Sequence, residues 1–195
     1  MEKYIEEYRA ERINRKREQI AKIKKELQPV FCKKIRFLIQ NQVLLNRDVI
    51  GNIEVFYLCR LLSSGYTESY ESVLGLSNAL LFLDKRRSET YWCPRYIYKD
   101  LKSDMQEVEK KLRTKFVRIE EYELLHMKQL LFKDDWEVLK DCFYELAQEQ
   151  LPMFSDSVLD FEPELKIMCG DYMDQLQLKS SFSIQQPIDE EDTEI

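Results

Sequence analysis

The amino-acid sequence predicts a mainly α-helical protein: a single helical domain with a long N-terminal helix and at most one small β-hairpin, near residues 79–98. Three observations lead to this fold class. Of the 195 residues, 44% are hydrophobic and 34% are charged, so a core can form beneath a strongly solvated surface. Only four residues are glycine. Apolar residues recur at spacings of three and four over most of the chain, which is typical of amphipathic helices.

The charge distribution divides the chain into three expected parts. Residues 1–36 hold 12 Lys and Arg against 6 Asp and Glu, whereas residues 134–195 hold 3 against 17. Such asymmetry indicates that the two ends meet different partners, or that they meet each other. We expect a basic helix over 1–28, a helical domain over 29–179 and a disordered acidic tail over 180–195, because this last stretch is too polar to offset the entropy of ordering.

Residues 2–27 predict one long helix, rich in Glu, Lys and Arg, that ends before Pro29. Its narrow apolar stripe suits a surface helix or a partner helix in a short coiled coil. The stripe consists of Ile13, Ile20, Ile23 and Leu27. The basic residues of the same helix are candidates for contacts with nucleic-acid phosphates. They are Arg12, Arg15, Lys16, Arg17, Lys22, Lys24 and Lys25.

The middle of the chain is expected to hold short helices over 31–42, 53–61 and 67–75, separated by turn residues and glycines. The apolar run 79–83 fits helix or strand equally well. Residues 90–98 are rich in strand-forming types, although Pro94 would place any strand there at a sheet edge.

The segment TESYESVLGLSNALLFLDK, residues 67–85, resembles a helix-turn-helix, with Leu74 to Ser77 as its turn. The resemblance implies a winged-helix-like module that reads DNA or contacts protein, with residues 90–98 as the wing. Glu71 stands where the motif has a small residue, and the would-be recognition helix presents Ala79 to Leu83 rather than hydrogen-bond donors. Two packed helices joined by a tight turn explain the segment better.

The second half predicts four amphipathic helices, over 101–116, 122–132, 134–150 and 163–176. Asp134 is expected to cap the third helix, and Pro163 to open the fourth. His126 is expected to be a partly buried packing residue.

A cluster of cations and aromatic residues between 85 and 98 is the other candidate contact surface. Interleaved Arg and aromatic side chains are typical of interface hot spots and of surfaces that stack single-stranded bases, and also of hairpin cores. The protein-contact candidates are Arg87, Tyr91, Trp92, Arg95 and Tyr96, and Arg86 joins the nucleic-acid candidates.

No residue pattern indicates an enzyme, a cofactor or a metal site. The glycines are too far apart for a phosphate-binding loop, and the single histidine offers no catalytic triad. Glu164-Leu165-Lys166 matches the E-x-K of metal-dependent nucleases, but lies at the start of a predicted helix rather than on a strand. Five scattered cysteines, with no leader or membrane-spanning run, favour reduced thiols in the cytoplasm or nucleus.

These observations predict a non-catalytic binding subunit or adaptor of an intracellular multi-protein assembly, with other protein subunits as its partners. A nucleic-acid-binding protein with a winged-helix-like module is the alternative. The net charge of −6 disfavours the alternative, because a polyanion is repelled unless the acidic regions lie far from the contact.

Overall fold

The computed structural model describes residues 2–46 and 52–184, and it combines long helices with a five-stranded mixed sheet. Helix accounts for 57% of the residues and strand for 21%, so the fold is α+β. The expectation of a mainly α-helical domain with one hairpin is therefore wrong. The part of the expected tail at 185–195 lies outside the described residues, whereas residues 180–183 belong to a strand.

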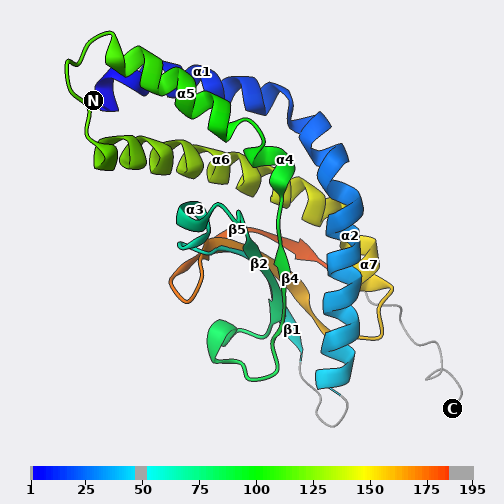
Figure 1. The fold of residues 1–195 in the computed structure, drawn as a ribbon. Coiled ribbons are helices and arrows are strands. Elements are labelled where there is room, and N and C mark those ends of the chain that lie inside the picture. The colour runs from blue at the N-terminus through cyan, green and yellow to red at the C-terminus, as the bar shows by residue number, and fades with distance from the viewer. Residues whose placement is uncertain (1, 47–51, 185–195) are drawn as a thin grey trace, which may run out of the picture.

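The elements follow one another along the chain as two helices, three strands, a helical crossover and two further strands (Figure 1). The helices are α1 (Glu2–Glu18), α2 (Ile20–Leu45), α3 (Ser64–Thr67), α4 (Arg95–Tyr98), α5 (Leu101–Arg113), α6 (Glu121–Glu149) and α7 (Leu151–Ser155). The strands are β1 (Ile53–Arg60), β2 (Ser72–Ser77), β3 (Ser88–Trp92), β4 (Phe161–Asp171) and β5 (Leu176–Ser183), and a 3₁₀ turn, η1, spans Leu81–Leu83.

The strands lie in the order β3-β2-β1-β4-β5. β1 and β4 are parallel and are connected through α5 and α6, while all other neighbours are antiparallel. Helices α2 and α6 cover one face of the sheet, with α4 packed against both helices, and the segment 78–87 lies over part of the outer face. Helices α1, α5 and the first half of α6 extend beyond the sheet as a three-helix projection, which we call the arm (Figure 1).

The N-terminal helix does not end at Pro29, which lies inside α2; the chain instead breaks at Gln19, between α1 and α2. A proline inside a helix costs about 3 kcal/mol because it removes one hydrogen bond and crowds the preceding turn. The buried stripe of α2 continues past Pro29 through Phe31 and Ile35, which are fully buried. Burial of this stripe outweighs the cost of the proline.

The helices expected over 53–61 and 67–75 are wrong, because these segments form β1 and β2. Most residues of β1 and all of β2 are buried on both faces of the sheet. A strand buried on both faces shows no alternation, so its apolar run cannot be told from a helix. The supposed helix-turn-helix turn at Leu74 to Ser77 lies within β2, and the winged-helix-like interpretation fails with it.

Two more predictions are corrected around the sheet. The extended pair consists of β2 and β3 rather than lying within 79–98, since 79–83 belongs to the connection that contains η1. The helix expected from Pro163 is strand β4, in which Pro163 lies near the beginning of the strand. Proline is tolerated at that end because it removes few ladder hydrogen bonds there.

The helix expected over 101–116 forms as α5, which ends at Arg113. The two helices expected over 122–132 and 134–150 are a single helix, α6. A capping box between Glu120 and Glu123 starts α6. Asp134 is therefore not a cap; it lies in the middle of α6 and pairs with Arg9 of α1.

The core lies between the sheet and its helices and is rich in aromatic rings. Phe31 of α2 contacts Trp92 of β3 at a centroid distance of 5.1 Å, and Phe56 of β1 contacts Phe143 and Phe154 at 5.2 and 5.3 Å. Aromatic pairs at such distances add to the stabilisation from area burial. The cluster joins α2, α6, α7 and the sheet into one body.

The outer face of the sheet holds a smaller cluster organised by Tyr57. Its ring crosses Gly75 of β2, and its hydroxyl donates to Glu89 of β3 at 2.7 Å. Tyr172 donates to the same carboxylate at 3.0 Å, and Arg87 pairs with it at 2.9 Å. Burial raises the pKa of Tyr57, which keeps its hydroxyl protonated as a donor.

Substituting Gly75 by alanine should destabilise the protein by about 1–3 kcal/mol, the usual cost of overpacking. The new Cβ would lie 2.2 Å from Cζ of Tyr57, whose ring is held by Glu89. Urea unfolding of Gly75→Ala measures the loss. The same substitution in a Tyr57→Leu background should cost clearly less, and an equal cost in both backgrounds would contradict this account.

Candidate functional site

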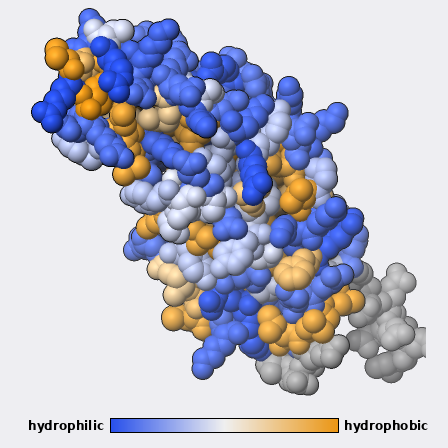
Figure 2. Space-filling model, in the orientation of Figure 1, coloured by the Kyte–Doolittle hydropathy of each residue, from blue (hydrophilic) through white to orange (hydrophobic). Residues whose placement is uncertain are grey.

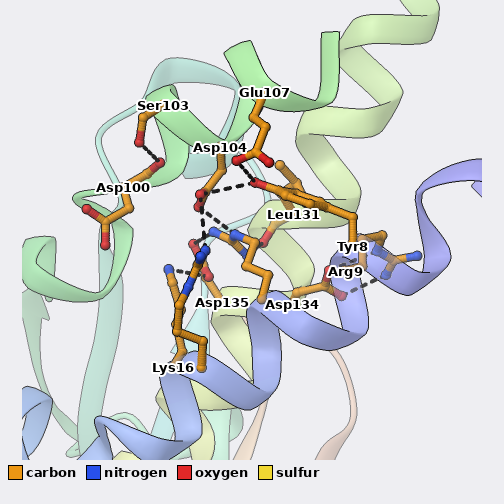
Figure 3. Close-up of polar contacts among 12 residues, drawn as sticks. Tyr8, Arg9, Lys16, Asp100, Ser103, Asp104, Glu107, Leu131, Asp134 and Asp135 are labelled. Carbon is orange, nitrogen blue, oxygen red and sulfur yellow. Dashed lines mark hydrogen bonds and ion pairs between the residues drawn. The ribbon is translucent and has the colours of Figure 1, made fainter. Parts of the chain in front are cut away.

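Within the arm, helix α1 is attached to α5 and α6 by a network of buried ion pairs (Figure 3). The Arg12 guanidinium donates to Asp104 of α5 at 2.5 Å and to Asp135 of α6 at 2.8 Å. The Lys16 ammonium donates to Asp135 at 2.6 Å and to the carbonyl oxygen of Ile97 at 2.6 Å. The Arg12 and Asp135 side chains are both fully buried, so a single network joins three helices and the end of α4.

Further ion pairs continue this contact along the surface. Arg9 forms two hydrogen bonds with Asp134, at 2.7 and 2.8 Å. Lys24 of α2 reaches two glutamates of α6, at 3.0 and 2.8 Å. The basic N-terminal residues thus meet acidic residues of α6, which confirms one of the two expectations drawn from the charge asymmetry.

Burial disfavours the charged forms of the Asp135 and Lys16 side chains in this network. It raises the pKa of the Asp135 carboxyl and lowers the pKa of the Lys16 ammonium, while the ion pair between them opposes both shifts. Each charge is therefore tolerated in the interior only because its partner is present.

The structure does not present the seven basic candidates of residues 12–25 and Arg86 as one continuous basic surface. Arg12 and Lys16 are buried, while Arg17 and Lys24 are paired with α6. The others are exposed or half-buried. These are Arg15, Lys22, Lys25 and Arg86.

The apolar stripe of the N-terminal helices packs against the chain itself. Ile23 and Leu27 are buried in the core, and Ile13 and Ile20 pack against it half-buried. The apolar side chains of the stripe are thus covered by the core of the same chain, and a second chain is not needed to cover them.

The five cation and aromatic candidates between 87 and 96 likewise lie in different environments and do not form one surface. Trp92 is buried against Phe31, and Arg87 pairs with Glu89. Tyr96 is half-buried beneath the Lys99 ammonium, at 4.1 Å. The two exposed members are Tyr91 and Arg95.

A candidate contact surface lies on the first two turns of α6. Tyr122 is 71% exposed and Leu125 is 44% exposed, and we call these two residues the α6 ridge. A hollow of about 400 Å³ opens beside Tyr122, and another of about 410 Å³ beside Leu125. Figure 2 shows hydrophobic side chains gathered at this free end of the arm.

The two hollows have apolar floors and charged rims. The first is lined by Glu2, Lys3, Tyr122, Glu123, His126 and Met127. The second includes Tyr70, Leu101, Met105, Leu124 and Leu125. At the rims, Glu2 pairs with His126 and Glu68 pairs with Lys128. A ring of charges around apolar contact area is the usual anatomy of a protein interface.

Sequence reasoning identified the helix that carries the ridge but not the ridge. Tyr122 lies in the helix expected over 122–132, but only His126 has a stated expectation, partial burial, and its side chain is in fact more than half exposed. Helical spacing places residues on one side of a helix, but it does not reveal which side the rest of the chain covers. The sequence contains no signal that would have distinguished the ridge from a buried stripe.

The motif considered for catalysis lies on a strand after all, since Glu164 and Lys166 belong to β4. Lys166 is paired with Glu54 of the neighbouring strand β1. Within residues 2–46 and 52–184, no group of three or more His, Cys, Asp or Glu side chains is placed to hold a metal ion. All five cysteines belong to these ranges and are free thiols.

Comparison with known proteins identifies no relative: no protein family, curated protein or solved structure matches the chain. In the described part of the chain, none of the helices combines the length and hydrophobicity that crossing a bilayer requires.

Replacing Asp135 by asparagine should lower the free energy of unfolding by about 3–5 kcal/mol, because the neutral amide leaves Lys16 buried without a counter-charge and leaves Arg12 with Asp104 alone. Urea unfolding followed by circular dichroism measures the change. Asp141→Asn is the matched control: it breaks an exposed pair with Arg17 and should cost less than about 1 kcal/mol. Similar losses in both variants would contradict a special role for the buried network.

Proposed function

We propose that this chain is a non-catalytic, protein-binding subunit, and that the α6 ridge is its contact surface. The single observation that carries the proposal is the pair of exposed apolar side chains, Tyr122 and Leu125, set between two hollows. Contiguous exposed apolar area and aromatic side chains beside pockets are features of protein contact sites.

The partner that fits this surface is an amphipathic helix of another protein. Tyr122 and Leu125 are three residues apart and so form a ridge on one side of α6. A facing helix can take such a ridge into the groove between its own side-chain rows and place its apolar residues in the two hollows. Charged rims of both signs suit a helix whose flanks are also of mixed charge.

The arm supports this role because it holds the ridge rigidly. The buried ion pairs of Arg12 and Lys16 fix α1 against α5 and α6, so the side chains at the arm's free end are ordered before a partner arrives. A surface ordered in advance binds with a smaller entropic loss.

Tyr122→Glu should weaken partner binding by at least about 30-fold, the effect of losing an interface hot spot of about 2 kcal/mol. The intact chain is used to capture its partner from native cells, and the affinity is then measured with the purified partner. Point variants are preferred over deletion of residues 1–28, because that deletion removes Arg12, Ile23 and Leu27 from the interior.

Val158→Glu, at an exposed position of the α7–β4 connection, is the matched control and should bind normally. Capture of a protein that binds the Tyr122→Glu variant as tightly as the intact chain would overturn the assignment of the ridge. Recovery of nucleic acid alone, released by salt, would instead favour the nucleic-acid alternative.

A further inference from the structure

Helix α2 and strand β3 run side by side in opposite directions at one edge of the sheet (Figure 1). The Lys34 ammonium lies 3.5 Å from the hydroxyl of Thr90, and the hydroxyl of Ser88 donates to the carbonyl oxygen of Leu38 at 3.0 Å. Just before β3 begins, the Gln42 amide donates to the carbonyl oxygen of Arg86 at 2.9 Å. The helix therefore follows the strand over its whole length.

β3 is an edge strand, so one of its sides pairs with β2 and the other pairs with no strand among residues 2–46 and 52–184. An uncovered edge presents free backbone donors and acceptors to another strand. The opposite edge, β5, carries an exposed lysine, Lys179, which is a common means of preventing such pairing. Within β3 the one charged residue, Glu89, is already paired with Arg87.

The side of α2 next to this edge carries an exposed apolar stripe. Val30, Phe37 and Leu44 are 47%, 46% and 54% exposed and follow one another at seven-residue spacing. Lys24 and Gln28, which contact α6, lie on the other side of the helix at about 100° per residue. Figure 2 shows apolar side chains at intervals along the course of α2. The stripe thus lies beside the open edge of β3.

The centre of the stripe lies close to the middle of the strand. Phe37 is the middle residue of the stripe, and Thr90 is the middle residue of β3. Phe37 lies in sequence between Lys34, which contacts Thr90, and Leu38, which contacts Ser88, so its level on β3 falls between these two residues, near Glu89. A single two-fold axis through this level can therefore pair both elements with their copies at once.

We infer that two copies of this chain associate through this edge, joining their sheets by antiparallel β3 strands and packing their α2 helices against each other. In this arrangement Phe37 meets Phe37 of the other copy, and Val30 meets its Leu44. An interface of this type is isologous, so each element contributes the same residues from both sides.

The distance expected between the two α2 helices agrees with this arrangement. α2 packs over both β3 and β2, so its axis lies above the outer two strands of the sheet. With strands about 4.8 Å apart, each α2 would lie about 5 Å from the two-fold axis. The two helices would then be about 10 Å apart, which is the usual distance for packed helices.

Charges on α2 agree with the antiparallel register as well. With Phe37 at the centre, Lys33 lies opposite Asn41 of the other copy, and Lys34 lies opposite its Gln40. Arg36 lies opposite Leu38 of the other copy, so none of the three cations of this stretch is directly opposite another cation.

The test is the molar mass of the full chain in solution, measured by light scattering after gel filtration and by sedimentation equilibrium. The intact chain should have twice the mass of one chain, which is 23.6 kDa. Phe37→Glu should weaken self-association by at least about 30-fold, the loss of an interface hot spot, and shift the mass toward one chain. Circular dichroism verifies that this surface variant remains folded.

Leu178→Glu, at an exposed position of the opposite edge strand, is the matched control and should remain dimeric. Phe37→Cys should form a disulfide between copies under mild oxidation, because this residue faces itself across the axis, whereas Leu178→Cys should not. A single-chain mass at the highest concentration reached overturns the inference. So does a dimer that survives Phe37→Glu, one that is lost in Leu178→Glu, or a monomer that binds an extended peptide at β3.

Discussion

The burial of Arg12 and Lys16 against Asp104 and Asp135 is the constraint on which the rest of the molecule depends. Helix α1 buries few apolar side chains, so its attachment to α5 and α6 relies on charges. Charges removed from water are costly unless each has a partner in good geometry, and these partners lie on two different helices. The network therefore determines where all three helices of the arm lie relative to one another.

Helix α6 connects the arm to the rest of the fold. Its second half carries Phe143 and Leu146 into the core beneath the sheet, while its first half forms the arm and ends at the α6 ridge. It also completes the connection that makes β1 and β4 parallel. One continuous helix thus serves as crossover, core element and support for the proposed contact surface, and a break at Asp134 would separate these roles.

The two proposed interfaces belong to different parts of the molecule. The α6 ridge lies on the arm, and the β3 edge with its stripe on α2 lies beside the sheet (Figure 1). Association through β3 would join two sheets and leave both ridges free. The resulting particle would hold two identical binding surfaces in a defined geometry, and bivalent presentation increases the strength of binding without any new contact.

The sequence alone determined the helices of clear three-and-four spacing, such as α5 and the second half of α6, because one buried side imposes that period. It also indicated, as one of two alternatives, that the basic and acidic ends meet. It could not identify β1 or β2, since a strand covered on both faces loses its alternation. It also missed β4, although buried and half-buried residues alternate along much of that strand. Nor could it show that Arg12 is buried while Tyr122 is exposed, because the partners of Arg12 lie 92 and 123 residues away. Exposure is decided by which segments the folded chain brings over each helix, and this depends on packing between distant residues rather than on local pattern.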